Sequence, residues 1–185
     1  MDDRTNARDH ASASLVRGGG LIDFTKPIGI FHAECLDKDG RVKWRDTAPN
    51  VVTTQGKNDW LDKYLGLGTA HAACVMGLHT TVGSATSTYS TPTPQVEATV
   101  IAARLAPTWG AAASGAKNNN ASPTSFTITG TATITGCFIA LGIAGITTVG
   151  HTTAGSILFS SGAFSASRAV VAADTLNVTY SMTLT

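Results

Sequence analysis

The chain has 185 residues, with 13 Lys and Arg against 12 Asp and Glu, and a formal net charge of +1. This length suits one domain, or one domain with an arm, and a chain of this size can bury a substantial core without disulfide bonds. The near-zero net charge disfavours a nucleic-acid-binding protein, which normally has a strong basic excess, so we expect no nucleic-acid partner.

Charged residues are distributed unevenly along the chain. Residues 1–68 contain ten Lys or Arg and ten Asp or Glu, whereas residues 69–185 contain only Glu97, Arg104, Lys117, Arg168 and Asp174. The exposed surface of a monomer normally carries many more charges. This indicates that other subunits cover much of the C-terminal surface. We expect a homo-oligomer, and the sequence does not distinguish a dimer from a trimer.

The cysteines and the apolar runs bear on compartment and membrane association. Cys35, Cys74 and Cys137 are an odd number at wide spacing, so we expect buried, reduced thiols rather than a disulfide framework. The first ten residues, MDDRTNARDH, lack the apolar core of a signal peptide. No window approaches the roughly 20 apolar residues of a membrane-spanning helix. We therefore expect synthesis in the cytoplasm and no membrane partner.

The N-terminal segment has the composition of an extended arm. Residues 1–20 mix charged and small residues and end in a run of three glycines, and we place the arm at residues 1–27, ahead of a domain at residues 28–185. Ordering such a segment costs conformational entropy that a contact surface must offset. We expect it to lie across a neighbouring subunit; folding back onto its own domain is the alternative. Arg4, Arg8 and Arg17 are candidate contacts to acidic partner residues, or else solvated charges.

Residues 28–52 predict a hairpin. Residues 28–36 alternate in the manner of a strand, residues 37–40 (Asp-Lys-Asp-Gly) predict a tight turn, and residues 41–46 alternate again. Pro49 interrupts the second strand, which we expect to continue through Val51 and Val52 at a sheet edge.

The next stretch predicts one short helix, at about residues 54–65. Thr53 or Thr54 offers the N-cap, and Gly66 and Gly68 end the helix. The helix has an apolar stripe at helical spacing, and the aromatic residues of that stripe are expected to anchor the helix to the sheet. The stripe consists of Trp60, Leu61, Tyr64 and Leu65.

The remainder of the chain is dominated by β-pattern. We expect strands at residues 72–78, 104–109, 137–141, 157–159 and 164–171, with a turn at Ser161-Gly162 and a final strand at residues 176–184. Ahead of residue 137, Phe126, Ile128 and then Ile134 alternate with threonines, which is a further β-pattern. Residues 79–100 form a long polar loop, either functional or covering a neighbour, and residues 111–123 a turn-rich tip. Short strands at this spacing predict a mainly β fold, a β-sandwich or jelly-roll-like domain.

Candidate chemical sites are weak throughout. The Asp37-to-Gly40 turn resembles the opening of a calcium loop, but the oxygen ligands that should follow are missing. His71, Cys74 and His79 have no fourth ligand nearby and would not converge on a strand. No serine or histidine lies in a recognisable catalytic setting. We therefore expect no metal, no cofactor and no enzymatic activity.

Three segments resemble parts of a known group of proteins. DKDGRVKWRDTAPNVVTTQGKNDWLDKYLGLGT, AAASGAKNNN and the ending RAVVAADTLNVTYSMTLT resemble segments of a family of tailed-bacteriophage virion proteins. The resemblance spans roughly residues 28–185 and leaves the arm outside. The stretch from Cys74 to His79 departs from the family by having fewer aromatic residues.

These virion proteins resemble capsid decoration (cement) proteins, small β-rich subunits that oligomerise and clamp neighbouring capsomers. The resemblance implies a location on the capsid surface of a virion, assembled in the host cytoplasm, with the major capsid protein and other copies of the chain as partners. The alternative is a tail, baseplate or head-fibre component that binds a host surface. The three tryptophans lie mostly in structural patterns rather than at loop tips, which favours the first hypothesis.

Overall fold

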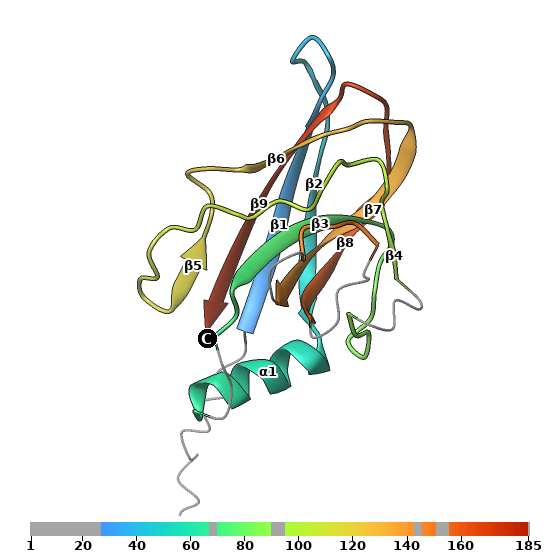
Figure 1. Ribbon diagram of the computed structural model, residues 1–185. Helices are drawn as coiled ribbons and strands as arrows, with labels where there is room; N and C mark the ends of the chain where they lie inside the picture. Colours follow the sequence, from blue (N-terminus) through green and yellow to red (C-terminus); the bar gives the residue numbers. More distant parts are fainter. Residues whose placement is uncertain (1–26, 67–69, 90–94, 143–145, 151–155, 185) are drawn as a thin grey trace, which may run out of the picture.

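The computed structural model describes residues 27–66, 70–89, 95–142, 146–150 and 156–184 (Figure 1). Within these ranges, two strands precede a single helix, α1, along the chain, and seven strands follow it. The elements are β1 Pro27–Leu36, β2 Val42–Val52, α1 Thr54–Tyr64, β3 Ala73–Thr81, β4 Val96–Glu97, β5 Ala116–Asn118, β6 Thr124–Thr127, β7 Ala132–Gly142, β8 Ile157–Val170 and β9 Thr175–Leu184.

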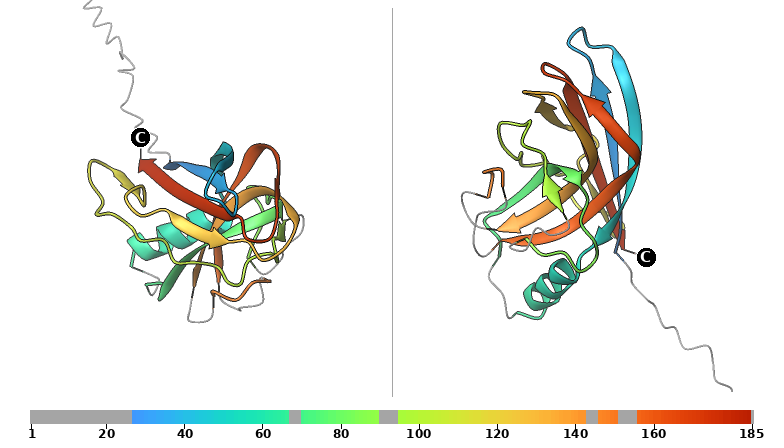
Figure 2. Two further views of the ribbon diagram at one scale, coloured as in Figure 1. Left: turned by 90° about the horizontal axis from the view of Figure 1, so that it is seen from above. Right: turned by 90° about the vertical axis from the view of Figure 1, so that its right-hand side faces the viewer.

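The strands form one strongly curved antiparallel sheet. Its order is β4-β3-β7-β8-β2-β1-β9-β5, and β6 pairs with β9 on the same edge as β5. The curvature brings the two ends of the sheet together, where Ile101 bridges to Ile128 and the Thr129 amide donates to the Val100 carbonyl at 2.8 Å. Figure 2 shows the sheet folding over on itself into two layers. The predicted mainly β, sandwich-like fold with one short helix is confirmed.

Strand β2 links the two layers. Its residues from Val42 to Pro49 pair with β1, and its last three residues, Asn50 to Val52, pair with β8. The prediction that Val51 and Val52 lie at a sheet edge is therefore wrong. Pro49 is tolerated inside a central strand because β2 changes partner at this point, so the missing amide hydrogen interrupts no continuous ladder.

Strand β8 runs unbroken through the predicted turn at Ser161-Gly162. Both residues are paired, with Val51 and Asn50 on one side and Phe138 and Cys137 on the other. The glycine is required by packing, because a Cβ at Gly162 would lie 2.8 Å from Cδ2 of Phe31. The prediction of two strands separated by a turn is wrong.

The core lies between the two layers. Inward-facing residues of β1 and β9 meet those of β3 and β7, in agreement with the alternation seen in the sequence. Its largest fully buried apolar side chains include Phe31, Tyr180, Phe126, Met76, Leu78 and Ile139.

Helix α1 lies beyond one end of the sheet, the end at which β1 begins and β9 ends (Figure 1). Thr53 caps it as predicted: its Oγ accepts from the Gly56 amide at 3.0 Å and donates to the Leu158 carbonyl. Gly56 packs tightly against the sheet, since a Cβ there would lie 2.5 Å from the Phe159 carbonyl oxygen. Two aliphatic residues of the stripe, Leu61 and Leu65, are 58% and 76% exposed, whereas the aromatic Trp60 lines a groove together with Phe159 of β8.

The described part of residues 79–100 packs on its own domain. Residues 79–81 extend β3, and Tyr89, Glu97 and Ala98 are buried. Residues 90–94 lie outside the described residues. The predicted strand at residues 104–109 is absent from the described structure, where Leu105 makes only a bridge to Met76.

Candidate functional site

A polar groove of about 450 Å³ lies on the outer face of β2, β1 and β9. Strand alternation places the core residues on the inner side and a row of polar side chains on the outer side. Thr47, His32 and Thr179 are register partners across the three strands, as are Arg45, Glu34 and Asn177. Ala33, Asp46 and Pro123 complete the lining.

The second row of the groove continues across a fourth strand. Arg45 Nε donates to Glu34 at 2.8 Å, and Ser125 Oγ of β6 donates to Asn177 at 2.5 Å. Arg45 and Glu34 are 67% and 33% exposed, so their ion pair contributes at most about 1 kcal/mol and can rearrange around a partner. The groove therefore presents neutral polar side chains and one charge-balanced ion pair, groups that could form hydrogen bonds with a polar surface of another protein.

Asp46 closes one side of the groove and is committed to internal contacts. Its carboxylate accepts from Arg168 Nε at 2.7 Å and from the Ser165 amide at 3.2 Å. Burial opposes its ionisation, but the hydrogen bonds from Arg168 and Ser165 outweigh burial and hold the pKa of Asp46 below its usual value. Asp46 thus fixes the groove wall rather than offering a free carboxylate.

The five charged side chains of residues 69–185 are almost all used within the domain. Glu97 pairs with Arg104, Asp174 with Lys43, and Arg168 with Asp46. The fifth residue, Lys117, donates to the Gly110 carbonyl at 3.0 Å. The surface contributed by this part of the chain is therefore nearly free of unpaired charge.

The Glu97–Arg104 pair is the most deeply buried of these contacts. Two parallel hydrogen bonds of 2.6 Å join the guanidinium to the carboxylate. Arg104 Nη1 also donates to Tyr89 and, at 2.7 Å, to the Ile146 carbonyl, while the Gly150 amide donates to Glu97 at 2.6 Å. The pair thus joins three loop segments to one another.

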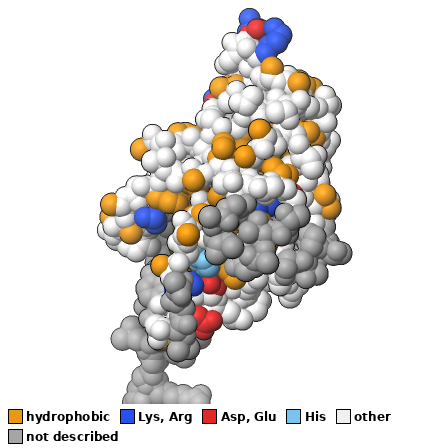
Figure 3. Space-filling model, viewed as in Figure 1, with side chains coloured by type: hydrophobic (Ala, Val, Ile, Leu, Met, Phe, Trp, Pro, Cys, Tyr) orange, Lys and Arg blue, Asp and Glu red, His pale blue; other side chains and the backbone are white. Residues whose placement is uncertain are grey.

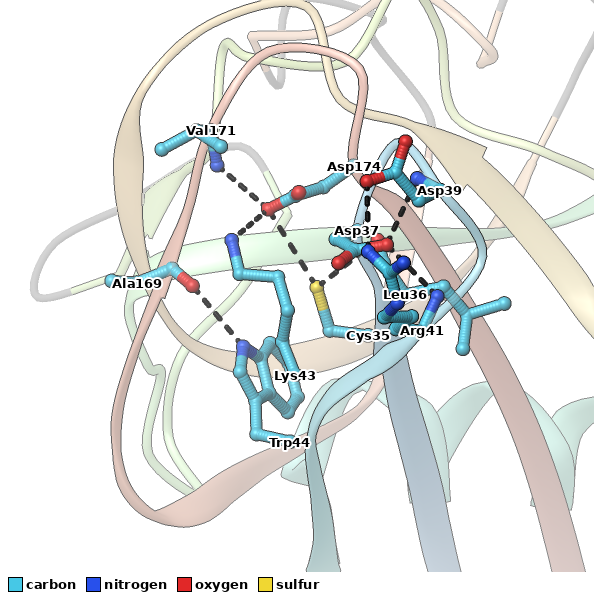
Figure 4. A network of polar contacts seen from close by, with 10 residues as sticks. All are labelled: Cys35, Leu36, Asp37, Asp39, Arg41, Lys43, Trp44, Ala169, Val171 and Asp174. Carbon is cyan, nitrogen blue, oxygen red and sulfur yellow. Dashed lines mark hydrogen bonds and ion pairs between the residues drawn. The ribbon is translucent and has the colours of Figure 1, made fainter.

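The Asp174 pair closes the other end of the domain, beside the β1–β2 turn (Figure 4). Its carboxylate accepts from Lys43 Nζ at 2.5 Å and from the Val171 amide at 2.9 Å. The hydrogen bond from Lys43 raises the pKa of that amine. Cys35 lies 3.8 Å from the same carboxylate, and burial, followed by this negative charge, raises the pKa of its thiol to about 11.

A cluster of exposed charged side chains lies at the β1–β2 turn, which projects from one end of the molecule (Figure 3). Lys38 and Arg41 both contact Asp39 at 3.0 Å. Asp37 accepts from the amides of Arg41 and Asp39, and these hydrogen bonds hold its pKa below the usual value. The predicted tight turn is confirmed, and the Asp37 carboxylate stabilises it by accepting these two amide hydrogen bonds.

Among the described residues, the His and Cys side chains considered from the sequence do not converge on one site. Arg4, Arg8 and Arg17 lie outside the described residues. His71 contacts Asp59 at 2.8 Å, whereas the buried ring of His79 stacks on Phe138. Among the residues that the structure describes, no cluster of three His, Cys, Asp or Glu side chains is placed to hold a metal ion.

The cysteines and tryptophans have packing roles. All three cysteines are free thiols; Cys35 and Cys137 are buried and Cys74 is half-buried. Trp44 and Trp109 pack against the core, and Trp60 lines a second groove described below. Sequence reasoning identified the scarcity of charges but missed that these charges pair internally, for which the spacing of the residues gives no signal.

No protein-family model matches this chain, and the searches of curated proteins and of solved structures return no significant match. The class of this protein is therefore described by its fold alone, which is mainly β, antiparallel and sandwich-like. In the described part of the chain, the single helix is too short to span a membrane.

Proposed function

We propose that this protein is a non-enzymatic structural component of a bacteriophage virion, a capsid decoration protein. In this role it forms a homo-oligomer and clamps neighbouring subunits of the major capsid protein. The observation that carries the proposal is the near absence of unpaired charge on the surface formed by residues 69–185, together with the sequence resemblance to virion proteins.

The composition of that surface suits contact with other subunits. Its exposed positions are mainly Thr, Ser and Ala, small side chains that lose little conformational entropy when they are covered. Charged residues are depleted at the centres of protein interfaces for the same reason that they are rare in cores, the cost of desolvation. Examples of these exposed residues lie on β6 to β8: Ser125, Thr127, Thr133, Ala163, Ser165, Ala166 and Ala169.

A decoration protein stabilises a capsid by binding the assembled lattice more tightly than it binds free capsid protein. Each occupied site then shifts the equilibrium towards the lattice by mass action, by about 2.7 kcal/mol at a free concentration 100 times the Kd. The arm at residues 1–27 and the outer polar groove are two further surfaces through which this chain would reach its neighbours.

The alternative is a tail, baseplate or head-fibre component that binds a host surface. The outer groove favours it, because Glu34, Arg45 and Asn177 offer charged and amide groups for hydrogen bonding at an open site. Against it, Trp44 and Trp109 are packed against the core, whereas binding surfaces of this kind usually display aromatic anchors.

Electron cryomicroscopy of virions that contain the protein distinguishes the two roles. Decoration predicts density for the domain repeated over the icosahedral lattice of the head. Density confined to the tail vertex would overturn the proposal in favour of the alternative.

Two variants test which surfaces make the attachment. Deleting residues 1–20 should leave the β domain folded but reduce the occupancy of the capsid lattice. Arg45→Glu, which places two acidic residues side by side in the outer groove, should reduce occupancy if that groove contacts the capsid. Lys38→Glu at the exposed turn is the matched control and should bind at wild-type occupancy. If all three variants decorate capsids fully, neither surface is the clamp.

A further inference from the structure

A second groove, of about 250 Å³, lies between α1 and the end of the sheet. Trp60 of α1, Phe159 of β8, and Met182 and Leu184 of β9 form its apolar walls. Ala116 and Lys117 of β5 complete it, and β5 is held in place by pairing with β9. A larger share of its surface is apolar than in the outer groove.

The N-terminal segment joins the domain at this groove. Pro27, the first described residue, is the register partner of Leu184, whose side chain forms one wall. An extended chain spans at most about 3.6 Å per residue. Phe24 therefore lies within about 11 Å of Pro27, and Leu21 within about 22 Å, so both can reach the groove without leaving their own subunit.

The composition of that segment matches the groove. Residues 1–14 contain no large apolar side chain after Met1, whereas residues 21–24 read Leu-Ile-Asp-Phe. Apolar side chains so close to an apolar groove are expected to be buried in it rather than left in water.

Charge complementarity supports the same match. Lys117, at the groove, has no carboxylate partner among the residues that the structure describes, and donates only to the Gly110 carbonyl. Asp23 is the one charged residue within residues 21–24. Its carboxylate would meet Lys117 when Ile22 and Phe24 lie against the apolar walls.

We infer that residues 21–24 of the same chain dock in the groove formed by Trp60, Met182 and Leu184, with Asp23 beside Lys117. The short tether favours the same chain over a second copy, because a linked segment acts at an effective concentration in the millimolar range. Docking fixes the point from which residues 1–20 leave the domain. The inference does not depend on the role in a virion.

Methyl NMR of the full chain tests the docking, with Met182 as the probe. The chain has three methionines: Met182 lies in the groove, Met76 is completely buried in the core, and Met1 is at the terminus. In the variant Leu21→Ser/Ile22→Ser/Phe24→Ser, the Met182 methyl resonance should shift, because the aromatic ring of Phe24 leaves its surroundings. An unchanged Met76 resonance shows that the fold is intact.

A matched control removes apolar groups outside the proposed segment. Leu15→Ser/Val16→Ser should leave the Met182 resonance at its wild-type position. If the triple variant leaves Met182 unmoved, or if the control moves it equally, residues 21–24 are not the occupant.

A mixing experiment identifies which chain supplies the segment. Isotope-labelled triple variant is mixed with an excess of unlabelled wild-type chain, whose segment is intact. Docking within one chain predicts no change at Met182 of the labelled variant. A shift towards the wild-type position would show that a second copy fills the groove and would overturn the assignment to the same chain.

A charge exchange tests the polar contact. Asp23→Lys should move the Met182 resonance towards that of the triple variant, and Asp23→Lys combined with Lys117→Asp should restore it. If the second change does not restore the resonance, Asp23 does not pair with Lys117. The apolar contacts of residues 21–24 are tested separately by the triple variant and its control.

Discussion

Arg104 and Glu97 form a two-pronged ion pair whose side chains are 0% and 2% exposed. The guanidinium also lies over the rings of Tyr89 and Phe138, with its central carbon 5.1 Å and 5.5 Å from the ring centroids. The pair therefore forms the centre of a small aromatic cluster under the loops. Two of the five charges in residues 69–185 are used to hold loops against β7 rather than to contact solvent.

Removing one partner of this pair should destabilise the domain severely. Glu97→Ala leaves Arg104 buried without its counter-ion, and we expect the free energy of unfolding to fall by about 3–5 kcal/mol. Urea denaturation followed by Trp fluorescence measures the loss. Asp39→Ala, which removes the centre of the exposed charge cluster at the β1–β2 turn, is the control and should cost less than about 1 kcal/mol. A loss of similar size in both variants would contradict a special role for the buried pair.

Replacing both partners by apolar residues should recover much of that loss. Glu97→Leu/Arg104→Met removes the two desolvated charges together, and such replacements are often neutral or stabilising. Tyr89 and the Ile146 carbonyl lose a donor, so recovery should be incomplete. A double variant less stable than Glu97→Ala would show that the donors to these groups matter more than the ion pair.

The three thiols should react slowly in the folded protein. Burial raises the pKa values of Cys35 and Cys74 to about 11 and raises that of Cys137 as well, so little thiolate is present near pH 8. Titration with a chromogenic disulfide reagent should show slow labelling without denaturant and fast labelling of all three thiols in denaturant. Cys74, the half-buried one, should react first. Rapid labelling that survives Cys74→Ser would instead reveal local opening around Cys35 or Cys137.

Local patterns predicted those elements whose cause is local. The alternation of Leu176, Val178 and Tyr180 reflects one buried and one solvated face, so β9 was predicted closely. The N-cap at Thr53 and the turn at Asp37 depend on hydrogen bonds within four residues, and both were predicted.

The features that were missed depend on distant partners. Gly162 resembles a turn residue in the sequence, whereas the structure uses it to admit the Phe31 ring from β1. Leu61 resembles a core residue in the sequence but is 58% exposed, whereas Gly56, which has no side chain to indicate burial, packs against Phe159 of β8. In the candidate site, the alternation of residues in the sequence predicted the polar faces of β1 and β9. That these faces lie beside polar residues of β2 and β6 depends on the pairing register of the strands, which the sequence does not show.

Filling the space at Gly162 should destabilise the sheet. In Gly162→Ala the new methyl group would lie 2.8 Å from the Phe31 ring and 3.2 Å from Cβ of Ala48, and both neighbours are fully buried. Overpacking of this kind costs about 1–3 kcal/mol, measurable as a lower midpoint of urea unfolding. Gly130→Ala is the matched control, because its nearest neighbour, Cγ1 of Val100, is 3.4 Å away. A stable Gly162→Ala variant would mean that β1 and β8 can move apart at little cost.

The Asp46 carboxylate should make stability depend on pH in the acid range. The folded state holds its pKa below the usual value of 3.8, so the unfolded chain takes up a proton first as the pH falls. The contribution of Asp46 is therefore fully present well above pH 3.8 and is lost as the pH falls through the lower pKa of the folded state. Asp46→Asn should cost about 1.5–3 kcal/mol at neutral pH, the range for hydrogen bonds to charged groups.

The test compares unfolding free energies of wild type and Asp46→Asn at neutral pH and at the lowest pH at which both remain folded. The difference between the two proteins should narrow in acid, because protonation removes the charge that the variant lacks. Glu34→Gln supplies the control, since its ion pair with Arg45 is exposed and should change stability by less than about 1 kcal/mol. A difference for Asp46→Asn that stays constant with pH would assign its effect to lost hydrogen-bond geometry rather than to the ion pair with Arg168.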